Sequence, residues 1–270
     1  MKDTVAALFA DEGITEYGFL PMERARLTYP ALLSREGDLT PLSVLLFLVP
    51  YYTGPADNLS LYAVSRDYHL YMRTLGERLL TALTAAHPDA TFRIFSDHSP
   101  IDERHAAVSC GLGILGDNGL LINEKYGSLV FIGEVFSSLP PPEGTEIHPL
   151  RTCEHCGACR RACPTRALSG EGECLSALTQ KKGELSPETV ALMRKHRTVW
   201  GCDLCQTACP HTRRVIERGV TTPIPFFREA RLPRLDREVL ATLTPEEFKT
   251  RAFSWRGRAV VERNVRAFEE

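Results

Sequence analysis

Cysteine spacing constrains this chain of 270 residues more than any other feature. Eight of its nine cysteines fall into two sets, and only Cys110 stands apart. The first set runs Cys153-x2-Cys156-x2-Cys159-x3-Cys163 and is followed by proline; the second consists of Cys174 and then Cys202-x2-Cys205-x3-Cys209, again followed by proline. Iron prefers tetrahedral thiolate ligands, and two four-iron clusters need eight of them. The spacing therefore predicts a redox protein that carries two 4Fe-4S clusters.

The same spacing predicts how the ligands are shared. In two-cluster ferredoxins the fourth cysteine of such a run binds the other cluster. One predicted cluster then takes Cys153, Cys156, Cys159 and Cys209. The other takes Cys163, Cys174, Cys202 and Cys205, where Cys174 supplies the ligand that the second run lacks. We expect Cys110 to be a core residue.

Two other interpretations of the cysteines remain open. Paired C-x2-C motifs also hold structural zinc, although the repeated spacing and the proline after each last cysteine favour clusters. Cys174 is alternatively a free buried thiol, which would leave one cluster a ligand short. Disulfides are not expected, because we predict a cytoplasmic protein whose thiols stay reduced. The N-terminus has acids where a signal peptide is basic, and no apolar run reaches the ~20 residues that span a membrane.

Charge and apolar patterning predict how the chain is divided. Residues 1–150 carry a net charge of −9 and residues 151–270 a net charge of +7. This basic excess is either a solvated face or a surface that attracts a polyanion such as RNA. We predict a mixed α+β or α/β fold with three parts. They are an α/β domain over residues 1–145, a ferredoxin-like 4Fe-4S domain over 146–215, and a C-terminal tail over 216–270 that packs on the core.

Local patterns predict the elements of the first domain. Apolar spacing indicates a helix over residues 1–12, a buried strand over 43–52, a helix over 59–86 and a strand over 91–97. Ser99 is expected to cap a further helix that has Pro100 in its first turn. Residues 119–123 and 128–136 are expected to pair as a hairpin.

Several longer motifs follow one another in an order that is typical of one enzyme family. They are RDYH (66–69), DHSPIDER (97–104), AVSCGLG (107–113), LLINEKYGSLVFIGEVF (120–136), the first cysteine run, CLSALT (174–179) and GCDLCQTACP (201–210). This set resembles the epoxyqueuosine reductases, which are cobalamin-dependent iron–sulfur enzymes of queuosine synthesis in tRNA. The resemblance covers residues 43–215 and continues more weakly to the C-terminus through SWRGRAVVERN.

The resemblance implies a reductase mechanism. Two clusters pass electrons singly to cobalamin bound by residues 1–145, and the reduced cobalt attacks or otherwise reduces the epoxide-bearing ring. A carboxylic acid protonates the departing oxygen, since an alkoxide is a poor leaving group. Asp97 matches the family's proposed proton donor; its other interpretation is a cap of the turn before Pro100.

The resemblance also implies cofactor contacts and partners. By motif match, the candidate cobalamin contacts are Tyr62, Leu121, Ile132, Val135, Ser176 and Asp203. Leu121, Ile132 and Val135 equally fit the core of a sheet. The implied partners are tRNA and an external electron donor such as flavodoxin or ferredoxin; we expect a monomer and no membrane association.

The chain also departs from the family pattern. Ile114 replaces a tryptophan, Asp117 replaces a lysine and Ala177 replaces an aromatic residue. The chain ends at Glu270, where many members continue into helical repeats that help to grip tRNA, so we expect a short form. Three alternatives therefore stay open: a related corrinoid reductase that acts on a small molecule, as reductive dehalogenases do; a ferredoxin-type electron carrier; and a zinc-stabilised nucleic-acid binder.

Overall fold

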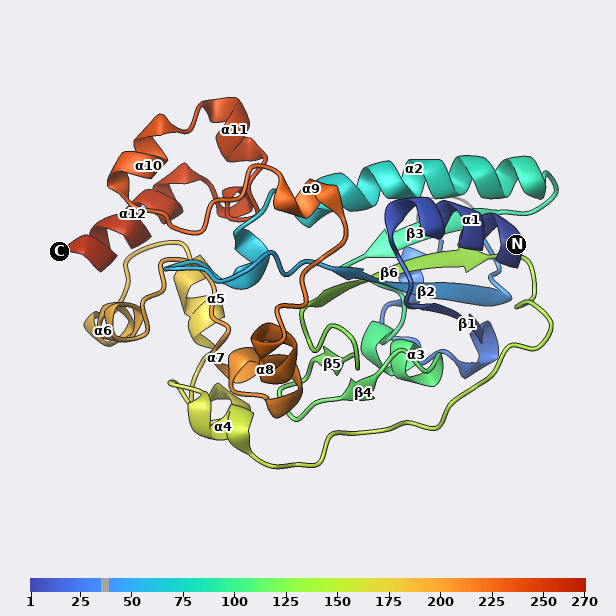
Figure 1. Cartoon of the computed structure of the whole chain (residues 1–270), viewed down its shortest axis with the longest axis horizontal. Coiled ribbons are helices and arrows are strands. Elements are labelled where there is room, and N and C mark those ends of the chain that lie inside the picture. The colour runs from blue at the N-terminus through green and yellow to red at the C-terminus, as the bar shows by residue number, and fades with distance from the viewer. Residues whose placement is uncertain (35–38) are drawn as a thin grey trace. The chain divides into compact units, whose positions relative to one another are not determined.

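The computed structural model of the chain describes residues 1–34 and 39–270 (Figure 1). Its contacts divide the chain into two compact units. The first unit comprises Met1–Pro50 and Tyr71–His155, and the second comprises Tyr51–Leu70 and Cys156–Glu270. Each unit therefore combines stretches that are separated in sequence. The domain boundaries predicted after residues 145 and 215 follow chain order and stay a prediction.

A four-stranded sheet forms the centre of the first unit, with the order β1-β2-β6-β3 (Figure 1). The strands are β1 (Tyr17–Pro21), β2 (Ser43–Pro50), β3 (Phe92–Ser96) and β6 (Val130–Ser137). All three pairings are antiparallel. The α+β class is therefore correct. The α/β description of this domain is wrong, because that class is built on parallel strands joined by crossover helices.

Helices cover both faces of this sheet (Figure 1). Helices α1 (Lys2–Glu12) and α2 (Tyr68–Ala86) lie on one side, where the ring of Phe9 is 5.0 Å from that of Phe47. Helix α3 (Glu103–Ser109) lies on the other side, where its alanines join Leu46 in one buried cluster. With both faces covered, all eight residues of β2 are buried, which explains the uninterrupted apolar run of that strand.

Three local predictions need correction. Helix α3 begins four residues after Ser99, and its N-cap is Asp102, whose side chain accepts a hydrogen bond from the His105 N–H. Helix α2 begins only at Tyr68, after the 3-10 turn η3 (Leu61–Ala63). The expected hairpin is reduced to a bridge between Asn123 and Gly127, because β5 (Leu121–Ile122) pairs with β4 (Ile114–Leu115) instead.

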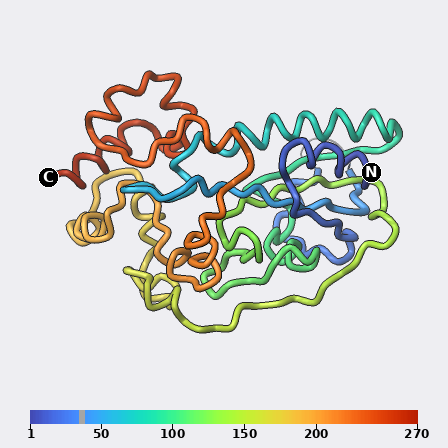
Figure 2. The backbone as a smooth tube through the Cα atoms, viewed as in Figure 1, coloured from blue at the N-terminus to red at the C-terminus, as the bar shows by residue number. Residues whose placement is uncertain are grey.

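The second unit is helical. Its helices are α4 (Ala158–Ala162), α5 (Leu175–Gln180), α6 (Pro187–Lys195), α7 (Leu204–Thr207), α8 (Pro210–Glu217), α9 (Pro225–Arg228), α10 (Arg237–Thr242), α11 (Pro245–Lys249) and α12 (Arg258–Glu269). Residues 51–70 run among them (Figure 2), and Leu59 forms a bridge with the fully buried Trp200. Within the described ranges, no helix is both long and apolar enough to cross a membrane.

Candidate functional site

The second predicted ligand set lies within the second unit. Cys163 ends α4, Cys174 precedes α5, and Cys202 and Cys205 flank the start of α7. Burial raises the pKa of Cys202 to about 11 and that of Cys205 to about 12, and both values also rise because of charge on Cys163 and Cys174. These four thiols are thus close enough to affect one another's ionisation. A cationic metal group bound by all four would offset the free-energy cost of placing several thiolates close together.

Backbone geometry around Cys163 also suits a metal ligand. Burial raises the pKa of this thiol, but hydrogen bonds from the backbone of Leu168, Thr165 and Ala167 and from the Thr165 hydroxyl lower it overall. Arg166 adopts a left-handed conformation, with φ of 53°, within this turn. Converging N–H groups stabilise a thiolate. The donor set therefore fits an iron–sulfur cluster.

The first predicted ligand set is divided between the units, since Cys153 belongs to the first and the other three residues to the second. Cys159 on α4 and Cys209 at the start of α8 are buried, whereas Cys156 is exposed. Cys153 accepts a hydrogen bond at its Sγ from the Asp117 N–H at 3.4 Å. Sulfur acceptors of this kind are usual around cluster thiolates.

Two residues outside the predicted ligand sets, Asp117 and His155, lie close to Cys153. The Nδ1 of His155 lies 2.7 Å from Oδ1 of Asp117, and its Nε2 lies 3.2 Å from the Thr152 hydroxyl. The ligand atoms of Asp117, Cys153 and His155 all lie within 4.8 Å of one another, close enough to hold one metal ion. A histidine between two ligand cysteines was the available signal in the sequence.

Asp97 directly follows β3 and adopts a left-handed conformation, with φ of 68°. Such a backbone is uncommon outside glycine and often marks a functional loop. The loop that follows is well anchored. The carbonyl of Pro100 accepts hydrogen bonds from the N–H groups of Thr28 and Tyr29, and the Asp102 N–H donates to the carbonyl of Arg26. Asp97 itself is exposed.

Two glutamates behind this loop have perturbed ionisation. Burial raises the pKa of Glu103 to about 7, with a further contribution from the charge of Asp97. Burial also raises the pKa of Glu134 to about 8, although a hydrogen bond from Ser99 lowers it. Sequence patterning missed both residues. The available signal was one glutamate inside the otherwise apolar run VFIGEVF.

The predicted cobalamin contacts in the first unit are core residues. Leu121 on β5 and Ile132 on β6 belong to the hydrophobic cluster under α3. Val135 is 1% exposed and pairs with Ile94 of β3. Their side chains are therefore occupied by packing within the protein.

The predicted contacts in the second unit are polar and partly occupied. The Asp203 carboxylate accepts hydrogen bonds from the Ser60 hydroxyl (2.7 Å), the Leu61 N–H (2.6 Å) and the Gln206 amide (2.9 Å). The Tyr62 hydroxyl accepts one from the Trp200 indole at 2.9 Å. The Ser176 hydroxyl accepts one from Gln180 within α5. Asp203 therefore holds Ser60 and Leu61 next to the segment that carries Cys202 and Cys205.

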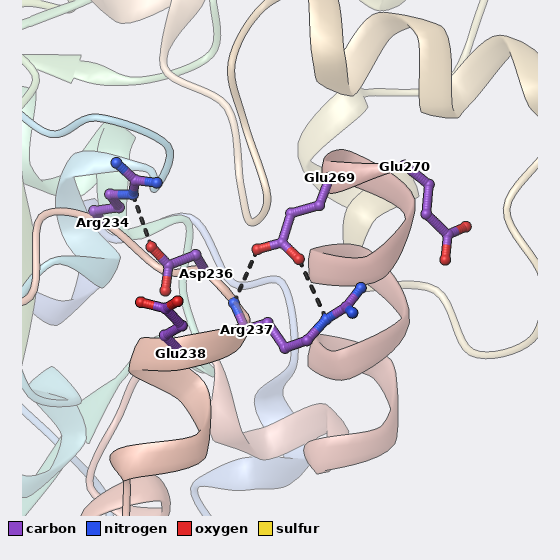
Figure 3. Close-up of a pocket in the computed structure, with 6 residues that line it drawn as sticks. All are labelled: Arg234, Asp236, Arg237, Glu238, Glu269 and Glu270. Carbon is purple, nitrogen blue, oxygen red and sulfur yellow. Dashed lines mark hydrogen bonds and ion pairs between the residues drawn. The ribbon is translucent and has the colours of Figure 1, made fainter.

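One surface pocket of the second unit lies apart from these residues (Figure 3). Four of the six charged residues that line it pair with one another. Arg234 Nε lies 2.9 Å from Asp236, and the Arg237 N–H donates to Glu269 at 2.9 Å. Because none of the predicted ligands or cofactor contacts lines this pocket, it is not a candidate active site.

A comparison with protein families matches residues 152–212 to a 4Fe-4S double cluster binding domain. Among curated proteins, the epoxyqueuosine reductase of Listeria monocytogenes is 34% identical over 212 residues, which are 74% of this chain and 53% of that one. The epoxyqueuosine reductase of Synechocystis sp. is 31% identical over 223 residues, or 77% of this chain and 74% of that one. The chain spans about half the length of the first curated relatives that it matches.

Solved structures show the same fold. The epoxyqueuosine reductase of Streptococcus thermophilus matches with a TM-score of 0.76 and 23% identity, over 99% of this chain and 80% of that one. An epoxyqueuosine reductase with an epoxyqueuosine-modified tRNA stem loop gives a TM-score of 0.75 with the same identity and coverage. The Bacillus subtilis enzyme, solved with an aspartate catalytic loop swung out of its active site, matches with a TM-score of 0.74.

Proposed function

This chain belongs to the epoxyqueuosine reductase family, and from that membership we propose that it reduces epoxyqueuosine in tRNA to queuosine. The observation that supports this most is the gathering of Cys163, Cys174, Cys202 and Cys205 in a segment that matches a double cluster domain. The basic charge of residues 151–270 supports tRNA as the partner. The relative bound to a modified tRNA stem loop agrees with this choice.

The proposed reaction consumes two electrons and two protons, because an epoxide becomes an alkene and water. When bound, the clusters supply single electrons from a donor such as flavodoxin or ferredoxin, and cobalamin supplies the two-electron chemistry at the epoxide. The eight cysteines hold the clusters, in the two sets that the spacing predicts. Backbone N–H groups around Cys163 and Cys153 stabilise their thiolates.

Asp97 is the proposed proton donor to the departing oxygen. Its left-handed backbone and the anchored loop after it present the carboxyl at the end of β3. A positioned acid of this kind typically contributes about 10²–10⁴-fold to a rate. The Bacillus subtilis relative has a catalytic loop that carries an aspartate, and this supports a catalytic role for Asp97.

Four of the six predicted side-chain contacts to cobalamin do not fit the structure. Leu121, Ile132 and Val135 are at most 8% exposed, and the Asp203 carboxylate already accepts three hydrogen bonds. Tyr62 and Ser176 are the other two predicted contacts, and both are partly exposed. We therefore propose these two as side-chain contacts and assign no step to the other four.

The first test is anaerobic reconstitution with iron and sulfide, followed by metal analysis and titration with hydroxocobalamin. We expect about eight irons per chain and a saturable shift of the corrin absorption bands. Reduced protein should then convert epoxyqueuosine in a tRNA stem loop to queuosine. Clusters without corrinoid binding would indicate an electron carrier, and zinc in place of iron would contradict the whole proposal.

A further inference from the structure

The backbone beside Cys153 places a hydrogen-bond donor on the sulfur of this residue. Leu115 and Thr152 form a parallel bridge. The Leu115 N–H donates to the carbonyl of Arg151 at 2.8 Å, and the Cys153 N–H donates to the carbonyl of Leu115 at 3.0 Å. The next donor along this ladder is the N–H of Asp117, because the hydrogen bonds of a parallel pair are evenly spaced. It donates to the Sγ of Cys153 at 3.4 Å, so the ladder ends on the thiol.

The side chain of Asp117 contacts the same loop a second time, through His155. Its Oδ1 lies 2.7 Å from Nδ1 of His155, and Nε2 of that ring lies 3.2 Å from the Thr152 hydroxyl. Both ring nitrogens of His155 are therefore engaged, one by each of the two paired segments. These residues and Cys153 all belong to the first unit, so the contacts lie within one compact body.

The backbone of His155 is one that a histidine adopts only with support. Its φ is 52°, in the left-handed region, where a β-carbon crowds the backbone. Gly157, two residues later, has a φ of 71° and adopts this region without that cost. Left-handed residues other than glycine persist where the surrounding structure holds them. We therefore expect the contacts of the His155 ring with Asp117 and Thr152 to maintain the shape of this loop.

A donor on the Cys153 sulfur affects any cluster that is bound there. Reduction adds negative charge to a cluster, and an N–H group that points at a ligand sulfur stabilises this charge. Hydrogen bonds to the sulfurs are accordingly one of the factors that set the reduction potential, and the loss of one lowers it. The Asp117 carboxylate acts in the opposite direction, because its negative charge lies within 4.8 Å of the Cys153 sulfur. The two effects of Asp117 thus have opposite signs and can be separated by mutation.

We propose that Asp117 and His155 are positioning residues for the cluster that Cys153 binds, and that they set its reduction potential by keeping the Asp117 N–H on the Cys153 sulfur. The proposal rests on the proposed function, because it takes Cys153 as a cluster ligand. Neither positioning residue is assigned a contact with substrate or cobalamin. A change at either one should alter the potential of the cluster that includes Cys153 and leave that of the other cluster unchanged.

Two substitutions of His155 separate its side-chain contacts from its backbone. His155→Ala removes both ring contacts and leaves a residue with a β-carbon in left-handed backbone. His155→Gly removes the same contacts but adopts that backbone freely, so it should disturb the loop less. His148→Ala is the matched control. His148 is an exposed histidine of the same unit, and its Nε2 lies 4.0 Å from the carboxylate of Glu146.

The first experiment measures the potential of each cluster and does not depend on activity. The reconstituted proteins are titrated electrochemically under anaerobic conditions, and electron paramagnetic resonance follows each reduced cluster. In His155→Ala one potential should become more negative than in the wild type while the other stays the same, and His155→Gly should show a smaller shift of the same sign. His148→Ala should match the wild type. Wild-type potentials in His155→Ala, or an equal shift in His148→Ala, would overturn the proposal.

The second experiment separates the position of Asp117 from its charge. Electron nuclear double resonance, compared between protein reconstituted in light and in heavy water, detects an exchangeable proton that is hydrogen-bonded to a cluster sulfur. Asp117→Asn keeps an oxygen for His155 and removes the charge, so it should retain the wild-type proton coupling and raise the potential. Asp117→Ala removes the oxygen as well and should lose that coupling. If both variants retain the coupling, Asp117 acts by charge alone and the positioning role is wrong.

Metal analysis of the same samples covers the remaining outcomes. If His155→Ala contains less iron than the wild type, the potentials are measured in His155→Gly. Loss of iron from both variants would mean that His155 is needed for cluster assembly and does not set the potential, which overturns the proposal. A metal ion beyond the clusters that disappears in His155→Ala would assign Asp117, Cys153 and His155 to a metal site of their own, and would overturn it as well.

The failure of this proposal differs from the failure of the proposed function. If the wild type binds both clusters but does not reduce epoxyqueuosine, the proposed function fails, and the potentials still decide the role of Asp117 and His155. If the wild type is active and every variant has its potentials and its proton coupling, only the positioning proposal fails. Zinc in place of iron would contradict both.

Discussion

Single residues carry most of what the sequence alone could predict about the site. The cysteine spacing predicted both ligand sets, and in the structure the charges of Cys163 and Cys174 raise the pKa values of Cys202 and Cys205. The assignment of these residues as cluster ligands stays a prediction. Glu103 and Glu134 could not be recognised in the same way. A glutamate on a short helix is ordinary, and one inside an apolar strand contradicts the pattern that locates the strand. Their environment exists only once α3 packs on β6.

Cys174 offers a direct test of the ligand assignment. Changing Cys174 to serine should remove one cluster's fourth thiolate, and iron content should fall from about eight to about four per chain. Cys110→Ser is the matched control, because Cys110 packs beside Gly18 in the first unit and belongs to neither set. Iron analysis and electron paramagnetic resonance measure the result. Full iron content in Cys174→Ser would mean that another residue supplies the ligand.

Glu134 should make stability depend on pH. Folding raises its pKa from 4.5 to about 8, so the folded state is penalised as pH rises from about 4.5, and the penalty is complete above about 8. Glu134→Gln removes this penalty. We expect the variant to gain stability over the wild type by up to about 4 kcal/mol at pH 8 and by little at pH 4.5. Denaturant unfolding at both pH values measures this difference, and equal gains would contradict it.

Individual elements were predicted more unevenly. The helix at the N-terminus and the buried strand β2 follow directly from local apolar spacing. The start of α3 could not be predicted in this way. The Ser99 hydroxyl donates a hydrogen bond to Glu134 and does not cap the helix, and Asp102 is the N-cap. The order of the strands in the sheet could not be predicted from the sequence either. The last strand, β6, lies between β2 and β3, and such long-range pairing leaves no local signal.

The cap of α3 is testable at this scale. Asp102→Ala removes the acceptor for the His105 N–H and should cost about 1 kcal/mol of stability. Asp102→Asn keeps a side-chain oxygen in place and should cost only a few tenths of that. Thermal unfolding of both variants compares them. Equal losses would show that the charge of Asp102, and not its hydrogen bond, stabilises the helix.

At the scale of the whole molecule, the two units differ in the length of their helices and in whether they contain a central sheet. The first unit has a sheet with helices on both faces, whereas α4, α5 and α7 of the second have five, six and four residues. Helices this short are not stable without tertiary support. The sequence predicted a cluster domain but could not show that residues 51–70 belong with it.

Removing iron should therefore loosen one unit more than the other. After chelation under anaerobic conditions, hydrogen exchange should become fast in residues 153–209 and stay slow in β2 and β6. Mass spectrometry of peptic peptides measures both regions in one sample. Equal protection before and after chelation would mean that the cysteine region folds without metal.

The division of the chain into units also affects its synthesis. The chain passes from one unit to the other after Pro50, after Leu70 and after His155. Residues 51–70 leave the ribosome long before their partners, since Leu59 pairs with Trp200 and Asp67 donates to the carbonyl of Thr250. The second unit therefore cannot be completed until the chain has been made at least as far as Thr250. Its clusters would then be inserted late, and neither unit can be obtained intact by a single cut in the chain.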